Sequence, residues 1–94
     1  MTEESQFQAK VITLATRLGY DFIYHTHNSR RSPKGFPDLI MIRPRDMRLV
    51  VIEFKIKPHK PTTEQQKWLD AFALVTNFCF LWYPEDWDEI LEVL

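Results

Sequence analysis

Residues 38–55 read DLIMIRPRDMRLVVIEFK, and this stretch predicts the centre of the fold. Segments 38–43 and 48–57 are rich in branched apolar residues, which favours two β-strands. Residues 44–47 separate them, and their sequence, Pro-Arg-Asp-Met, is typical of a turn. We therefore expect an antiparallel hairpin in which the start of the first strand lies beside the end of the second.

The segments before the hairpin predict a helix and a strand. Residues 3–18 carry apolar side chains at helical spacing, and Gly19 follows as a helix stop. Residues 20–25 predict a short strand, and residues 26–35 have the composition of a loop.

The segments after the hairpin predict two helices with a strand between them. The first of these helices is expected to start at Thr62 or Thr63, both good N-caps, and to run to about residue 75. Its expected buried stripe consists of Trp68, Leu69, Phe72 and Val75. Residues 78–83 predict a strand that is apolar on both faces, which favours the centre of the sheet. The closing helix is expected to bury Trp87, Ile90, Leu91 and Leu94.

The expected order of elements is αβββαβα, an α+β fold in which one sheet is flanked by helices. The 94 residues, 45% of them apolar, suffice for one core, so residues 1–94 are expected to form a single domain. No apolar run reaches the roughly 20 residues of a membrane span. Residues 2–5, TEES, do not resemble a signal peptide, so we expect an intracellular, cytoplasmic protein. The single cysteine, Cys79, is expected in the core.

The net charge of −1 hides an uneven distribution along the chain. Residues 1–24 sum to −1, residues 25–60 to +6 and residues 61–94 to −6. A basic middle that holds the candidate site suits a protein that binds a polyanion. Charge alone leaves an alternative open, which is a solvated basic face balanced by the acidic carboxy-terminal third.

Charged side chains at one end of the hairpin are expected to converge. Glu53 and Lys55 alternate with apolar neighbours, so they share one face of their strand, about 7 Å apart. Asp38 begins the paired strand and is expected beside them. Two carboxylates next to a lysine suit Mg²⁺ or Mn²⁺, and the backbone carbonyl of Phe54 is a further candidate ligand. The alternative is a structural Glu53–Lys55 ion pair.

Two polar residues lie within the apolar stripes of the predicted helices. Glu4 precedes Phe7 by three residues, and Gln65 precedes Trp68 by three. Both positions indicate side chains aimed at the same site. The alternatives are a first-turn acid favoured by the helix dipole for Glu4, and a capping-box partner of Thr62 for Gln65.

Polar and basic residues in segments 28–34 and 57–60 flank this site in the sequence. We expect these segments to bind DNA phosphates without reading bases, with mobile solubilising loops as the alternative. The residues concerned are Ser29, Arg30, Arg31, Lys34, Lys57 and Lys60. His25 and His27 are too few for the usual zinc ligand set, which favours a phosphate contact or a structural hydrogen bond for either.

Three motifs in order, GFPDL at 35–39, IEFK at 52–55 and TEQQKWL at 63–69, resemble VRR-NUC, the virus-type replication-repair nuclease branch of the PD-(D/E)XK superfamily. The resemblance spans nearly the whole chain and implies a restriction-endonuclease-like fold with Mg²⁺- or Mn²⁺-dependent DNA cleavage. It implies metal-ligand roles for Asp38 and Glu53 and contact of Glu4 with the metal or its water. Lys55 would lie near the attacking water, and Gln65 would support the site.

The same resemblance implies a homodimer that acts on branched DNA such as four-way (Holliday) junctions. Trp82, Tyr83 and Trp87 are candidates for the dimer interface, with a simple core role as the alternative. Two other functions remain open: a catalytically inactive nucleic-acid-binding or scaffolding module of this fold, and a sequence-specific restriction-type nuclease.

Overall fold

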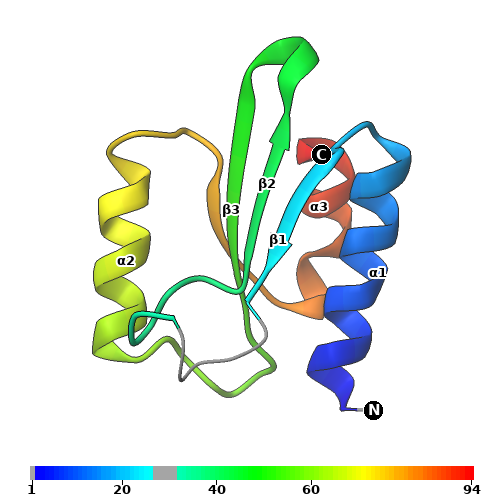
Figure 1. Cartoon of the computed structure of the whole chain (residues 1–94). Coiled ribbons are helices and arrows are strands. Elements are labelled where there is room, and N and C mark those ends of the chain that lie inside the picture. Colours follow the sequence, from blue (N-terminus) through cyan, green and yellow to red (C-terminus); the bar gives the residue numbers. More distant parts are fainter. Residues whose placement is uncertain (1, 27–31) are drawn as a thin grey trace.

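The hairpin forms as predicted. In the computed structural model, which describes residues 2–26 and 32–94, strand β2 (Leu39–Arg43) pairs antiparallel with strand β3 (Arg48–Phe54). A short 3-10 helix, Pro44–Asp46, makes the turn between them. The hairpin crosses the middle of the molecule (Figure 1).

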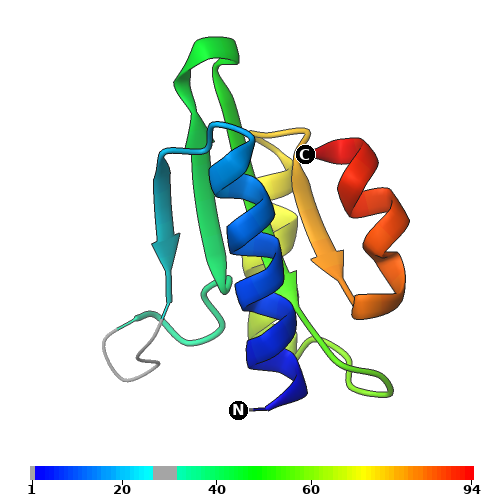
Figure 2. The ribbon, with the colours of Figure 1, turned by 90° about the vertical axis from the view of Figure 1, so that its right-hand side faces the viewer.

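Four strands form one sheet in the order β1-β2-β3-β4. β1 (Phe22–His25) pairs antiparallel with β2, and β4 (Cys79–Trp82) pairs parallel with β3. β4 is therefore an edge strand, and the prediction that it lies in the centre of the sheet is wrong. β4 is apolar on both faces because helices cover both faces of the sheet at this edge (Figure 2).

Within the described residues, three α-helices pack on the sheet: α1 (Glu3–Arg17), α2 (Thr63–Ala73) and α3 (Trp87–Val93). α1 and α3 lie on one face, and α2 lies on the opposite face (Figures 1 and 2). Thr2 caps α1 and Thr62 caps α2, each through a side-chain oxygen that accepts a backbone N–H. The predicted α+β class and the order αβββαβα are confirmed.

The main core lies between α1 and the sheet. The rings of Phe7 on α1 and Phe54 on β3 meet edge to face, with their centroids 5.2 Å apart. Val50 and Ile52, which alternate with Phe54 along the strand, are fully buried in the same cluster. Trp82 is also fully buried in this cluster. The core alternative is thus confirmed for Trp82, and its assignment to a dimer interface is wrong.

The sheet face that carries α2 is covered in part. α2 contacts β3 and β4. Phe22, Tyr24 and Ile42, on β1 and β2, are 62%, 56% and 41% exposed. The half of this face nearest β1 is therefore open and apolar.

Each of two predicted buried stripes includes one residue that the structure shows to be exposed. Val75 is 76% exposed, because α2 ends at Ala73 and the helical periodicity stops there. Leu91 is 49% exposed, because Ile90 faces the sheet and its neighbour points about 100° away around the helix. The predictions that these two residues are buried are wrong. In the part of the chain that the structure describes, no helix has the length and apolar character needed to cross a membrane.

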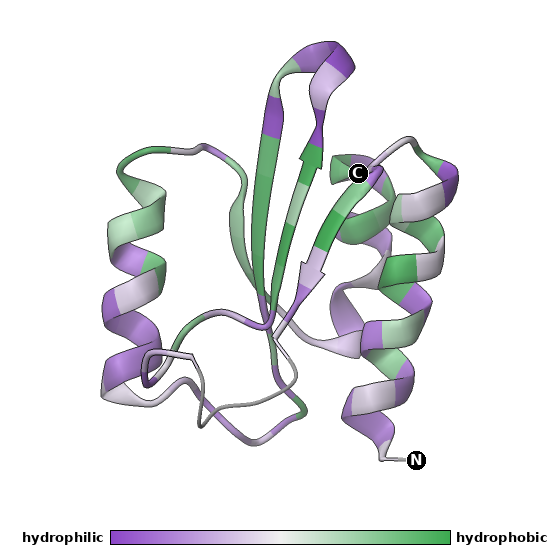
Figure 3. Cartoon of the chain, in the orientation of Figure 1, coloured by the Kyte–Doolittle hydropathy of each residue, from purple (hydrophilic) through white to green (hydrophobic). Residues whose placement is uncertain are grey.

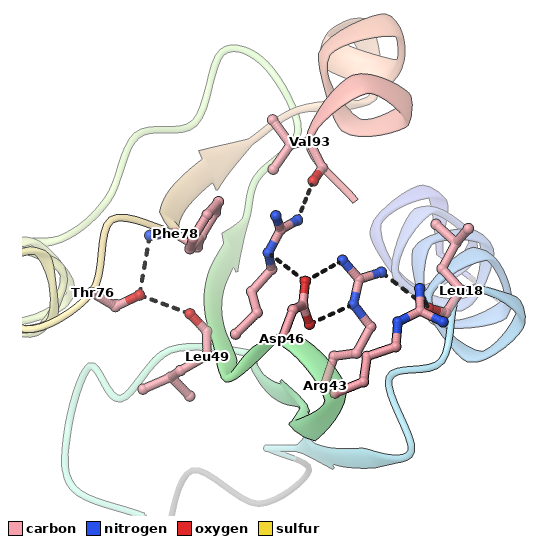
Figure 4. A network of polar contacts seen from close by, with 9 residues as sticks. Leu18, Arg43, Asp46, Leu49, Thr76, Phe78 and Val93 are labelled. Atoms are coloured by element: carbon pink, nitrogen blue, oxygen red, sulfur yellow. Dashed lines mark hydrogen bonds and ion pairs between the residues drawn. The ribbon is translucent and has the colours of Figure 1, made fainter.

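Arginines at the hairpin turn tie it to the carboxyl end of α1 (Figure 4). Arg43 donates two hydrogen bonds of 2.9 Å to the Asp46 carboxylate and a third, of 3.0 Å, to the carbonyl of Leu18. Arg45 donates to the same carbonyl at 3.3 Å. Cationic donors at the last carbonyls of a helix satisfy its unpaired acceptors and oppose its dipole.

Arg48 makes the corresponding contact with α3, donating a hydrogen bond of 2.8 Å to the carbonyl of Val93. The turn between β2 and β3 is hydrophilic (Figure 3). The turn lies at the far end of β2 from Asp38, about 17 Å away along five residues of strand. Arg43, Arg45 and Arg48 thus stabilise the fold. Part of the positive charge of residues 25–60 therefore has a structural role.

Candidate active site

The predicted convergence at the other end of the hairpin is confirmed. Extended by one residue, the antiparallel register of β2 and β3 places Asp38 opposite Glu53. The backbone N–H of Phe54 donates to Asp38 Oδ2 at 2.8 Å. Lys55 Nζ lies 3.8 Å from Glu53 Oε2. The two arms of the hairpin therefore bring two carboxyl groups and one ammonium together.

In this carboxyl pair Glu53 is fully buried and Asp38 is half-buried. Glu53 is 1% exposed. Burial, and after it the negative charge of Asp38, raises the pKa of Glu53 to about 8. Burial also raises the pKa of Asp38, while the hydrogen bond from the Phe54 N–H opposes that rise. Two adjacent carboxylates are costly in such surroundings, so near neutral pH the pair favours taking up a proton or a cation.

The donors at this place fit a divalent cation. Among the described residues, Glu53 Oε1 has no hydrogen-bond partner although it is buried. The ion pair with Lys55 involves the other oxygen, so a structural Glu53–Lys55 pair does not account for Oε1. Within residues 2–26 and 32–94, no three His, Cys, Asp or Glu side chains form a metal-binding group. The fitting donor set is thus two carboxylates with backbone carbonyl oxygen and water, as Mg²⁺ accepts.

Glu4 lies at the rim of the site. It comes from the first turn of α1, and its side chain is partly buried. Burial, and next the charge of Asp38, raises the pKa of Glu4, while the charges of Lys55 and His59 lower it. Phe7, three residues further along α1, packs against Phe54, whose N–H donates to Asp38, so the first turn of α1 lies near the carboxyl end of the hairpin that holds this pair. Glu4 does not complete a group of three ligands among the described residues.

Gln8 is a residue of this region that the sequence interpretation missed. It is 8% exposed, and its Nε2 donates to Glu4 Oε1 at 3.3 Å. Its Oε1 lies 2.6 Å from Nε2 of His25 on β1. A structural hydrogen-bond role for His25 is thereby confirmed. The available signal was the spacing, because a polar residue four positions after Glu4 shares its helix face.

Gln65 forms a capping box with Thr62, which was one of the two roles expected for it. Its Oε1 accepts the Thr62 N–H at 2.8 Å, and its own N–H donates to Thr62 Oγ1 at 3.2 Å. α2 in turn holds the loop before Asp38. Gly35, at φ +84°, lies so close to α2 that an added Cβ would be 2.6 Å from the Glu64 backbone carbon. Gln65 therefore stabilises the helix against which this loop packs.

The expected DNA-binding residues that the structure describes are exposed. Lys34 has an 84% exposed side chain, 3.6 Å from Glu64, and Lys57 and Lys60 are exposed after β3. The remaining expected positions lie outside the described residues: His27, Ser29, Arg30 and Arg31.

The mixed sheet, with an aspartate placed beside a Glu-x-Lys sequence by one hairpin, defines a nuclease-like fold. A family model, the VRR-NUC domain, matches residues 5–75. Because this match covers more than half of the chain, the protein belongs to the VRR-NUC domain family, and the resemblance seen in the sequence is confirmed. The family is one of nucleases, which makes DNA the expected substrate. Searches among curated proteins and among solved structures give no match.

Proposed function

We propose that the protein is a Mg²⁺- or Mn²⁺-dependent endodeoxyribonuclease that hydrolyses phosphodiester bonds, with a preference for branched DNA such as four-way junctions. The observation that carries this proposal is the pair of Asp38 with the buried Glu53, beside Lys55. A buried carboxylate oxygen without a partner is unfavourable in a structural ion pair, and oxygen donors of this kind are what hard divalent cations bind. Membership of a nuclease family supports the same chemistry.

Asp38, Glu53 and the backbone carbonyl of Phe54 are the proposed metal ligands. A cation bound there would polarise the scissile phosphate and lower the pKa of a bound water. The Phe54 N–H holds the Asp38 carboxylate in place through its 2.8 Å hydrogen bond. Glu4, at the rim, is proposed to accept a hydrogen bond from water at the site.

Lys55 is the proposed partner of the attacking water. Its side chain is 16% exposed, and its ammonium is held 3.8 Å from Glu53 Oε2. From this place the ammonium can donate to the water or to a phosphate oxygen that gains charge during the reaction. Direct hydrolysis by water requires no covalent intermediate with a side chain. Gln65 is proposed to act indirectly, by capping the helix that holds the Gly35 loop.

Phosphate binding is assigned in this proposal to the exposed residues Lys34, Lys57 and Lys60. Ser29, Arg30 and Arg31 are assigned to the same task on sequence grounds alone. A homodimer is a further part of the proposal, carried by the family resemblance, and an intracellular location is a part that rests on the sequence alone. Sedimentation that gives a strict monomer at working concentration would contradict the dimer.

The test is a cleavage panel of junction, flap, splayed and linear duplex DNA with Mg²⁺, Mn²⁺ or excess EDTA. Cleavage is expected with either metal and not with EDTA. Lys55→Met is expected to lower cleavage at least about a hundredfold, the cost of losing one transition-state donor, and to leave DNA binding within about threefold. Lys67→Met, an exposed change on α2, is the matched control. Equal cleavage in EDTA would contradict metal dependence, and binding without cleavage in Mn²⁺ would favour the inactive module.

A further inference from the structure

A buried amide on α1 lies between two ionisable groups from different elements. Gln8 is 8% exposed and follows Phe7, which is part of the core. Its Nε2 donates to Glu4 on the same helix, and its Oε1 meets Nε2 of His25 on β1 at 2.6 Å. A buried amide requires partners for both its ends, and Gln8 has one at each.

The neighbours of this amide determine its orientation. The Glu4 carboxylate accepts hydrogen bonds, so it takes the Nε2 end of Gln8. The Oε1 end then faces His25, whose Nε2 must carry a hydrogen to donate to it. The reverse orientation would place Oε1 against a carboxylate oxygen, which sets two acceptors face to face. Gln8 therefore holds Glu4 and selects the Nε2-protonated form of His25 at the same time.

Both partners of Gln8 lie on elements that border the carboxyl pair. His25 pairs with Leu39 in the sheet, and the N–H of Thr26 donates to the Asp38 carbonyl at 2.9 Å. Phe7, three residues after Glu4 on α1, packs against Phe54, whose N–H donates to the Asp38 carboxylate. Gln8 therefore joins side chains from two elements that meet near Asp38.

We propose that Gln8 is a positioning residue of the active site, which holds the Glu4 carboxylate and the His25 ring in fixed orientations beside Asp38 and Glu53. This inference rests on the proposed function, because it assigns a task within the same site. Without Gln8, the partly buried Glu4 would be free to change rotamer, and the hydrogen bond between Gln8 and His25 would be lost. Residues that orient the groups around a metal act on metal affinity and turnover.

The test compares Gln8→Met with Gln6→Met. Methionine matches glutamine in length and in helix propensity and removes both hydrogen bonds, and Gln6 is exposed on the same helix. Gln8→Met is expected to weaken Mn²⁺ binding about tenfold by calorimetry and to lower kcat about tenfold, with KM changed less than about twofold. Gln6→Met should change none of these. Urea unfolding of both variants separates these effects from loss of the fold.

A second readout does not depend on cleavage. Long-range ¹H–¹⁵N spectra are expected to show the Nε2-protonated form of His25 in the wild type and a smaller share of that form in Gln8→Met. A double variant with Glu4→Gln should lose less Mn²⁺ affinity than the two single losses combined, because both changes remove the same interaction. Should Gln8→Met not fold, Gln8→Asn carries the same expectations, since its shorter amide cannot reach both partners.

Two results overturn the assignment of Gln8. One is a Gln8→Met protein whose Mn²⁺ affinity and kcat equal those of Gln6→Met. The other is a loss that appears in KM alone, which indicates a structural effect on DNA binding. In both cases an active wild type leaves the proposed function standing. A wild type that neither binds Mn²⁺ nor cuts DNA refutes the proposed function, and the role of Gln8 falls with it.

Discussion

Replacing Glu53 by glutamine is expected to remove a large pH dependence of stability from the metal-free protein. The pKa of Glu53 is raised from 4.5 to about 8, first by burial and next by the charge of Asp38. The unfolded chain therefore releases this proton near pH 4.5, while the folded protein keeps it to about pH 8. The resulting stabilisation is complete below the lower value and is lost as the pH rises through the upper one.

The magnitude follows from the size of the shift. At about 1.4 kcal/mol per pKa unit, ionisation of Glu53 lowers the free energy of unfolding by about 3 kcal/mol between pH 6 and pH 9. Glutamine has the shape of a protonated glutamate and does not titrate, so Glu53→Gln should lack this decline. The variant should be close to the wild type in stability at pH 6 and clearly more stable at pH 9.

The assay is urea unfolding in EDTA at several pH values, with Glu92→Gln as control. Glu92 is exposed on α3, so its replacement makes the same chemical change without touching the carboxyl pair. Other groups that titrate in this range are present in all three proteins, and the difference from the wild type isolates Glu53. Parallel pH profiles for the wild type and Glu53→Gln would refute the reasoning.

Three further outcomes are expected. Phe7→Ala should lower the free energy of unfolding by about 3 to 5 kcal/mol in urea titrations, because it leaves a cavity against Phe54. Thr62→Ala should cost about 1 kcal/mol by removing the cap of α2, and a change below a few tenths would contradict the capping box. Excess Mn²⁺ should raise the melting temperature of the wild type more at pH 8.5 than at pH 6, since the cation displaces a proton from the pair. Asp38→Asn should lose that increase, and an equal increase would place the cation elsewhere.

The hairpin and the meeting of its charged residues could be predicted because both depend on local rules. Side chains alternate along a strand, and a short turn determines the antiparallel register, so Asp38 must come beside Glu53. The position of β4 could not be predicted in the same way. A strand whose two faces are both covered has the same apolar sequence pattern in the centre of a sheet and at its edge. Here helices cover both faces of a strand that lies at the edge.

Side-chain networks were harder to predict than strands. The spacing of Gln65 allowed two roles, and choosing between the site and the capping box required the path of the backbone before Thr62. Gln8 was missed because its second partner, His25, is distant in the sequence and is brought near by the pairing of β1 with the sheet. Arg43 and Arg48 are part of the positive charge of residues 25–60. Their structural role could not be predicted, because it depends on the positions in space of the carboxyl ends of α1 and α3.

The two ends of the hairpin respond to acid in opposite ways. At the turn, the hydrogen bonds from Arg43 hold the pKa of Asp46 below its usual value, so this anchor stays ionised in mild acid. At the other end, burial raises the pKa of both Asp38 and Glu53, so these carboxyl groups take up protons at a higher pH than Asp46 does. Protonation should therefore weaken cation binding at the Asp38–Glu53 end, while the Arg43–Asp46 ion pair at the turn stays intact. Activity lost on acidification is then expected to return on neutralisation without any refolding.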